Sequence, residues 1–122
     1  MPTTLTTNLY TKMAKDLDLD SSAEQIDTGA KTIFGVSLDN SQNVASNYVK
    51  FYNSAAPSVG TTSPEFVVRL TPGQALDIVF GDDGAGDNTA FATALSIAGV
   101  TTGGTAGSTP PANDLLATVL TN

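Results

Sequence analysis

The 122-residue chain contains no cysteine, no histidine and no tryptophan. Without cysteine it can form neither a disulfide nor a thiolate metal site, so side-chain packing and strand pairing must hold the fold. Without histidine it lacks the commonest general base and the commonest metal ligand. We therefore expect a protein that is not an enzyme and that has no cofactor, with Ca²⁺ as the one ion that its acidic residues favour.

Charged side chains are also scarce, at 14% of residues, and the net charge is −7. Phosphate groups are bound by clustered Lys and Arg, and the chain has five such residues in total. We therefore expect no direct contact with nucleic acid and none with an anionic membrane. Ser, Thr and Asn cost less to desolvate than charged groups, so a neighbouring protein could cover this surface readily.

No apolar run approaches the ~18 residues of a membrane-spanning helix. The first residues, Met1–Thr4, lack the basic and apolar regions of a secretory signal. Synthesis in a cytoplasm is therefore the expectation.

Apolar and polar residues alternate along most of the chain, which is the period of a β-strand. Strands are predicted at Thr4–Tyr10 (a strand or arm), Ala30–Leu38, Asn47–Asn53, Glu65–Leu70, Gln74–Phe80, Thr89–Val100 and Leu115–Leu120. The pattern predicts an all-β fold, either an antiparallel β-sandwich or a jelly-roll-like barrel, of six to eight strands with an extended N-terminal arm. Residues 1–27 are expected to form the arm and an acidic loop, and residues 28–122 the β-sandwich domain.

Two local predictions accompany this fold. Lys12–Glu24 is ambiguous and is predicted to be a loop with at most one helical turn. Pro72-Gly73 suits a type II turn and predicts a β-hairpin between the strands on either side. The expected core consists of Phe34, Val36, Val49, Phe51, Phe66, Val68, Leu70, Leu76, Ile78 and Phe80.

Two acidic segments could bind Ca²⁺. Asp16, Asp18, Asp20, Glu24 and Asp27 have the spacing of the oxygen ligands in an EF-hand loop. Ser21 and Asp27 replace the Gly and the bidentate Glu of that loop, so a solvated acidic loop is the alternative.

The second segment carries the candidate metal ligands Asp82, Asp83 and Asp87 on a Gly-rich loop. Its alternative is again a solvated loop, held open by repulsion between the carboxylates. Glycoside hydrolysis would need two carboxylates held in a cleft. Nearly all acidic residues here fall in expected loops, and Asp77, which lies in a strand, is expected to face outward.

Several apolar and aromatic residues are predicted to face outward, where they could form an interface. Tyr48 and Tyr52 flank Lys50 on one strand face and could stack on a sugar ring or dock on a neighbouring protein. The candidate interface residues are Thr4, Leu5, Leu9, Tyr10, Tyr48, Tyr52, Val67 and Val79. The Ala-rich face of Ala90–Ala98 would also admit a neighbour, and its alternative is a strand buried on both faces within one domain.

One group of known proteins has segments of similar composition in the same order along the chain. The segments concerned here are Thr32–Asn40, Tyr48–Asn53, Val59–Pro64 and Ala98–Gly107. From about Gly29 onward, the chain resembles small β-sandwich virion structural proteins of tailed phages, especially cyanophages. Such proteins include capsid decoration (cement) proteins and tail accessory proteins.

The resemblance implies a capsid decoration protein that binds the outer surface of the phage head as a small homo-oligomer, dimer or trimer. Its partners would be the major capsid protein and copies of itself. The alternative is a tail or fibre accessory protein whose β-sandwich binds a host glycan through Tyr48, Tyr52 and the loop at 82–87.

Overall fold

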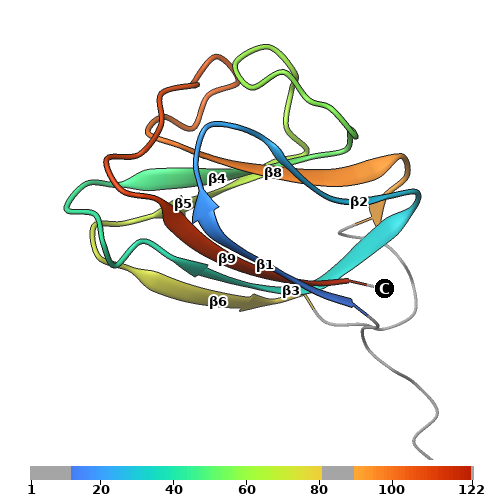
Figure 1. The fold of residues 1–122 in the computed structure, drawn as a ribbon, viewed down its shortest axis with the longest axis horizontal. Coiled ribbons are helices and arrows are strands. Elements are labelled where there is room, and N and C mark those ends of the chain that lie inside the picture. The colour runs from blue at the N-terminus through green and yellow to red at the C-terminus, as the bar shows by residue number, and fades with distance from the viewer. Residues whose placement is uncertain (1–11, 81–89, 122) are drawn as a thin grey trace, which may run out of the picture.

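A computed structural model describes residues 12–80 and 90–121, which form two antiparallel sheets packed face to face (Figure 1). None of these residues is helical. The predicted antiparallel β-sandwich is confirmed, with four long strands in each sheet. The expected N-terminal arm, at residues 1–11, lies outside the described residues.

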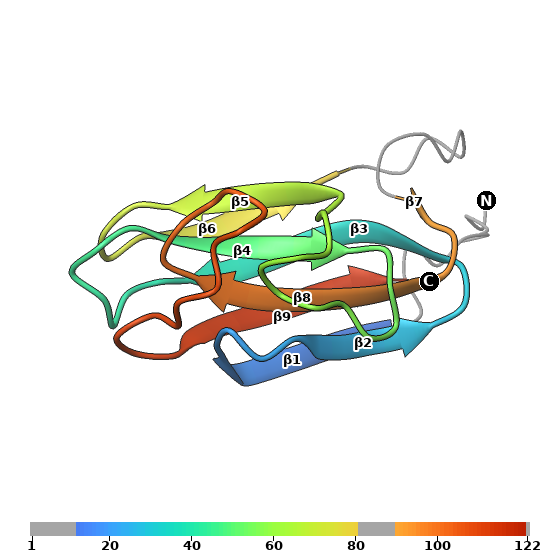
Figure 2. The ribbon, with the colours of Figure 1, turned by 90° about the horizontal axis from the view of Figure 1, so that it is seen from above.

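The first sheet has the order β1-β9-β3-β6, and a two-residue strand, β7, also pairs with β3. Its strands are β1 (Lys12–Leu19), β9 (Leu115–Thr121), β3 (Lys31–Asp39), β6 (Ala75–Val79) and β7 (Ala90–Phe91). The second sheet has the order β2-β8-β4-β5. Its strands are β2 (Glu24–Thr28), β8 (Ala94–Val100), β4 (Asn47–Tyr52) and β5 (Phe66–Leu70). Figure 2 shows β1 and β2 along one side of the sandwich and β5 and β6 along the opposite side.

The prediction of a loop at Lys12–Glu24 is wrong. Residues 12–28 form the edge strands β1 and β2, which pair with β9 and β8 in different sheets. Residues 12–27, which were expected to form part of the arm and the acidic loop, therefore belong to the sandwich. An edge strand needs one partner and leaves much of its length in water, so alternating Asp and Leu side chains are compatible with this position.

The prediction of a hairpin around Pro72-Gly73 is also wrong. β5 pairs with β4 and β6 pairs with β3, so the turn carries the chain from one sheet to the other. The turn itself has the expected geometry, with φ of 73° at Gly73 and a 3.1 Å hydrogen bond from the Gln74 amide to the Thr71 carbonyl. Alternation shows which face of a strand is apolar, but it does not identify the partner strand.

The core lies between the two sheets. All the predicted core residues except Phe34 belong to its main cluster or pack against it. Phe66 contacts Phe80 across the sheets with an edge-to-face ring distance of 5.8 Å. A register shift between Ile33 and Gly35 turns Ile33 inward in place of Phe34. This bulge breaks the strict alternation from which the faces of β3 were predicted.

The outer face of the second sheet is covered by the chain's own loops, residues 53–65 and 101–114 (Figure 1). Ser96 donates to the Ser54 carbonyl at 2.6 Å. The Lys50 ammonium group donates to the Gly104 and Gly107 carbonyls at 2.5 and 2.7 Å, and it is 0% exposed. Burial lowers the pKa of Lys50 below its usual value.

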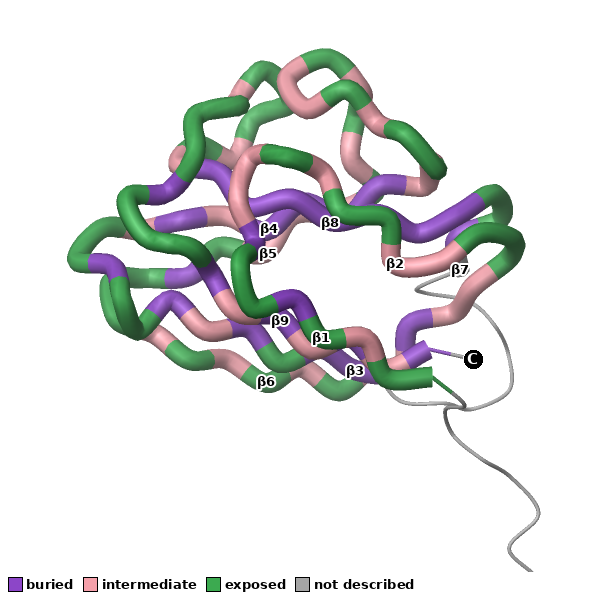
Figure 3. The backbone as a smooth tube through the Cα atoms, viewed as in Figure 1, coloured by how far each residue is buried: buried purple, intermediate pink, exposed green. Residues whose placement is uncertain are grey.

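This cover accounts for two outcomes. The expected exposure of Lys50 and Tyr52 is wrong, because both are 0% exposed, and Tyr48 is half-buried against Gly103. β8 is buried along its whole length (Figure 3), with Leu95 and Ile97 in the core. Its Ala-rich face therefore packs within the domain, as the alternative interpretation predicted.

Candidate functional site

The outer face of the first sheet carries an apolar row that no part of the described chain covers. Strand register places Met13 opposite Leu120, Leu120 opposite Gly35, and Gly35 opposite Val79. Residues opposite each other in neighbouring strands face the same side of a sheet. Met13 is 57% exposed and Val79 is 84% exposed, so this side faces outward.

Gly35 makes the centre of this row a groove. With no side chain at this position, the floor lies open between the flanking residues, and the groove has a volume of about 310 Å³. It is lined by Met13, Gly35, Val36, Ser37, Asp77, Ile78, Val79, Thr118 and Leu120. A Cβ atom at Gly35 would lie 3.3 Å from the Ile78 carbonyl oxygen and 3.7 Å from a Leu120 methyl group. A larger side chain there would fill the groove.

A polar row borders the apolar one. Lys15 lies opposite Thr118, and Ser37 lies opposite both Thr118 and Asp77. The Ser37 hydroxyl donates to the Asp77 carboxylate at 2.6 Å. An apolar centre with a polar border is the usual composition of a protein interface.

The predicted interface residues that the structure describes divide between the two sheets. Val79 is exposed in the apolar row, whereas Val67 is half-buried on the covered face of the second sheet. Tyr52 is completely buried and cannot contact a partner directly. The residues Thr4, Leu5, Leu9 and Tyr10 lie outside the described residues. Sequence reasoning missed Met13, because its exposure depends on where β1 lies in the sheet.

A second candidate site is a carboxylate cluster at the open side between β1 and β2. One carboxylate oxygen from each of Asp16, Asp18 and Glu24 can be chosen so that all three lie within 4.8 Å of one another. The three residues line a cleft of about 250 Å³. Asp16 lies opposite Ala117, and Glu24 lies opposite Ile97, both of which are buried. Asp16 and Glu24 therefore point inward from different sheets and meet at the edge of the sandwich.

Asp16 is the buried member of this cluster. It is 8% exposed, and its Oδ1 atom accepts a 3.1 Å hydrogen bond from the Asp18 amide. Its Oδ2 atom is buried and has no hydrogen-bond partner in the described chain. Burial is the main cause that raises the pKa of Asp16 to about 6, and the neighbouring Asp18 side chain and the negative charge of Glu24 act in the same direction.

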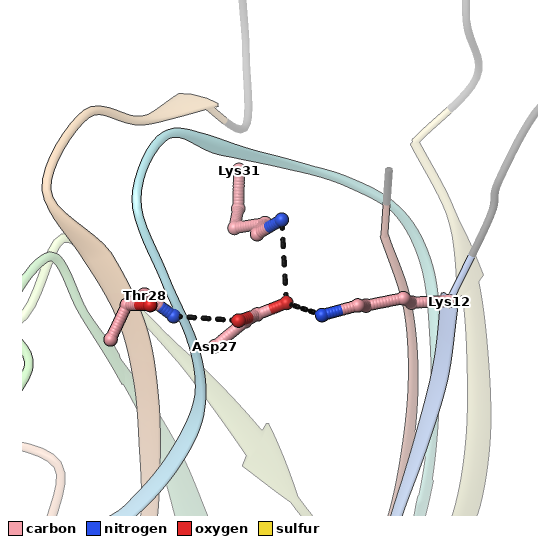
Figure 4. Close-up of polar contacts among 4 residues, drawn as sticks. All are labelled: Lys12, Asp27, Thr28 and Lys31. Carbon is pink, nitrogen blue, oxygen red and sulfur yellow. Dashed lines mark hydrogen bonds and ion pairs between the residues drawn. The ribbon is translucent and has the colours of Figure 1, made fainter.

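The other two acidic residues of the EF-hand-like spacing do not join this cluster. The Asp20 carboxylate accepts a 2.8 Å hydrogen bond from the Ser22 amide. Asp27 pairs with Lys12 and, at 3.3 Å, with Lys31 (Figure 4). The hydrogen bonds from Lys12 and from the Thr28 amide hold the pKa of Asp27 at about 2. The five acidic residues therefore do not form one loop around an ion.

The second predicted calcium site, Asp82, Asp83 and Asp87, lies outside the described residues. Over the described ranges, no helix is long and apolar enough to span a membrane. Comparison of the chain with protein-family models, curated proteins and solved structures finds no match.

Proposed function

We propose that this chain is a non-catalytic virion structural protein, a capsid decoration protein that binds the outer surface of a tailed-phage head. Its partners are the major capsid protein and further copies of itself. The resemblance in residues 29–122 supports the virion role. The uncovered apolar row of the first sheet supports an attachment surface.

The row is the observation that carries the proposal. Met13, Gly35, Val79 and Leu120 form a continuous apolar strip across all four strands of the sheet. Scattered apolar residues are normal on a protein surface, whereas a contiguous group indicates an interface. Burying this strip against a capsid subunit would remove the exposed Val79 and Met13 side chains from water.

The alternative of a glycan-binding tail protein loses its main support. It depended on Tyr48 and Tyr52 as an exposed stacking platform, and Tyr52 is 0% exposed. A sugar ring cannot stack on a side chain that lies under the protein's own loops. We therefore do not propose glycan binding.

The test is cosedimentation of the purified protein with empty phage heads. We expect the wild-type chain to pellet with heads and to keep doing so as ionic strength rises, because the strip is apolar and contributes no ion pairs. Val79→Lys should weaken binding by about tenfold or more, since a charge would be buried in the contact. Val79 is 84% exposed, so this variant should remain folded.

Val44→Lys is the matched control. Val44 is 96% exposed and follows β3 in the loop to β4, away from the apolar row. It should bind heads like the wild-type chain. Failure of the wild-type chain to pellet with heads would overturn the proposal, and binding to tails instead would assign it to another part of the virion. Equal binding by both variants would show that the apolar row is not the attachment surface.

A further inference from the structure

We propose that Asp16, Asp18 and Glu24 form a binding site for a hard divalent cation, with Ca²⁺ as the best fit. The cation would join the edge strands β1 and β2 across the open side of the sandwich. This inference goes beyond the proposed role in the virion, and its test requires no phage particle.

The first argument is convergence from two sheets. Asp16 and Asp18 belong to β1 and Glu24 to β2, and these strands have no direct strand pairing with each other. A register shift between Asp16 and Leu19 lets Asp16 and Leu19 both point inward. Within this bulge the Asp18 amide donates a hydrogen bond to the Asp16 carboxylate. Bulges of this kind reorient side chains at sheet edges.

The second argument is the buried oxygen. Asp16 is more than nine-tenths buried, and its Oδ2 atom is buried without a hydrogen-bond donor from the described chain. A buried carboxylate oxygen without a partner is costly, and a bound cation would remove that cost. Both ion pairs in the described chain use Asp27, and Lys15 lines the cleft without pairing to any of the three carboxylates.

The third argument is size. Ca²⁺ binds oxygen at about 2.3–2.6 Å, so oxygens on opposite sides of the ion are about 4.8 Å apart. The three carboxylates have oxygens within 4.8 Å of one another, which is close enough for all three to share one Ca²⁺ ion. Mg²⁺ requires a tighter shell, at about 2.0–2.1 Å. The cleft, at about 250 Å³, leaves room for the water molecules that complete a calcium shell.

The competing explanation is a shared proton. If Asp16 keeps a proton that it shares with Asp18, the cluster would need no cation at neutral pH. Asp16→Asn would then leave the protein as stable as before or make it more stable, and Ca²⁺ would have no effect on any variant.

The test is thermal unfolding of the purified full chain, in chelator and in ~5 mM CaCl₂ at constant ionic strength. We expect Ca²⁺ to raise Tm by about 5 °C, because a ligand that binds the folded state stabilises it. Titration calorimetry should show a single binding event per chain. Glu24→Gln and Asp18→Asn should each weaken Ca²⁺ binding by about tenfold or more, since each removes a charged ligand.

Glu65→Gln and Asp114→Asn are matched controls, because both residues are exposed acids outside the cluster. They should bind Ca²⁺ like the wild-type chain. Unchanged Tm of the wild-type chain in Ca²⁺ would overturn the proposal, as would full binding by Glu24→Gln. Loss of binding in the triple variant Asp82→Asn, Asp83→Asn, Asp87→Asn, with Glu24→Gln unaffected, would move the site to that loop and would also overturn the proposal.

Discussion

The inner faces of the two sheets are both apolar and pack against each other. Their outer faces differ in how far the chain covers them. Loops 53–65 and 101–114 cover the second sheet, where Lys50, Tyr52 and Ser96 are completely buried. The first sheet has no such cover from the described chain, and Val79, on its edge strand β6, is 84% exposed. One sheet has an outer layer built from the chain's own loops, whereas residues 12–80 and 90–121 supply no such layer over the apolar row of the other.

In the second sheet, the contacts of the covering loops must offset the entropy that is lost when those loops are ordered. Ordering a loop residue costs about 1–2 kcal/mol of backbone entropy, so a long covering loop must form many buried contacts. The contacts here include three carbonyl groups around Lys50 and the close approach of Gly103 to Tyr48. A partner that brings its own folded surface to the first sheet would not pay for this ordering again.

The largest expected effect comes from removing the Lys50 ammonium group, which binds carbonyl groups of the loop at 101–114. Lys50→Met should destabilise the protein by about 2–4 kcal/mol, because the Gly104, Thr105 and Gly107 carbonyls lose a charged donor. Urea unfolding would measure the loss. Limited proteolysis should also cut the loop at 101–114 faster in this variant.

Lys15→Met is the control on the uncovered sheet. Lys15 is exposed and forms no ion pair in the described chain, so its removal should change stability by less than about 0.5 kcal/mol. Equal losses in the two variants would mean that Lys50 does not hold the loop in place.

A smaller effect compares the same substitution on the two outer faces. Val100 faces the covered side of β8, opposite Tyr48, and is 0% exposed, whereas Val79 is exposed. Val100→Thr should cost about 1–2 kcal/mol, because it buries a hydroxyl group in an apolar position. Val79→Thr should change stability by less than about 0.5 kcal/mol. Thermal unfolding of the two variants would test this contrast, and a stable Val100→Thr would show that the loops cover β8 only loosely.

The sequence was sufficient to predict the fold class and most of the core. Alternation identified the inward residues of β5 and β6 because packing between sheets requires one apolar face from each strand. It could not predict that β5 and β6 belong to different sheets, since a hairpin and a crossover between sheets bury the same faces. The strands β1 and β2 were also not predicted, because alternation does not identify pairing partners and theirs lie far along the chain.

The candidate sites were harder to predict, for a related reason. Tyr52 and Val79 both looked like outward residues, and in both cases the side chain points away from the core. Whether an outward side chain is buried depends on loops that contribute no periodic pattern. The acidic spacing from Asp16 to Asp27 likewise indicated an EF-hand-like loop, whereas the structure groups Asp16, Asp18 and Glu24 and pairs Asp27 with lysines.

The smallest expected effect concerns the Tyr52 hydroxyl under the cover. This group is buried and has no hydrogen-bond partner in the described chain, and burial raises the pKa of Tyr52. Tyr52→Phe removes the unsatisfied hydroxyl and keeps the ring, so stability should stay the same or rise by up to about 1 kcal/mol. Tyr48→Phe, on the same face and half-buried, serves as the control and should be neutral. A loss above about 1 kcal/mol for Tyr52→Phe in urea unfolding would mean that the hydroxyl is hydrogen-bonded in solution, most simply to a water molecule trapped beneath the loops.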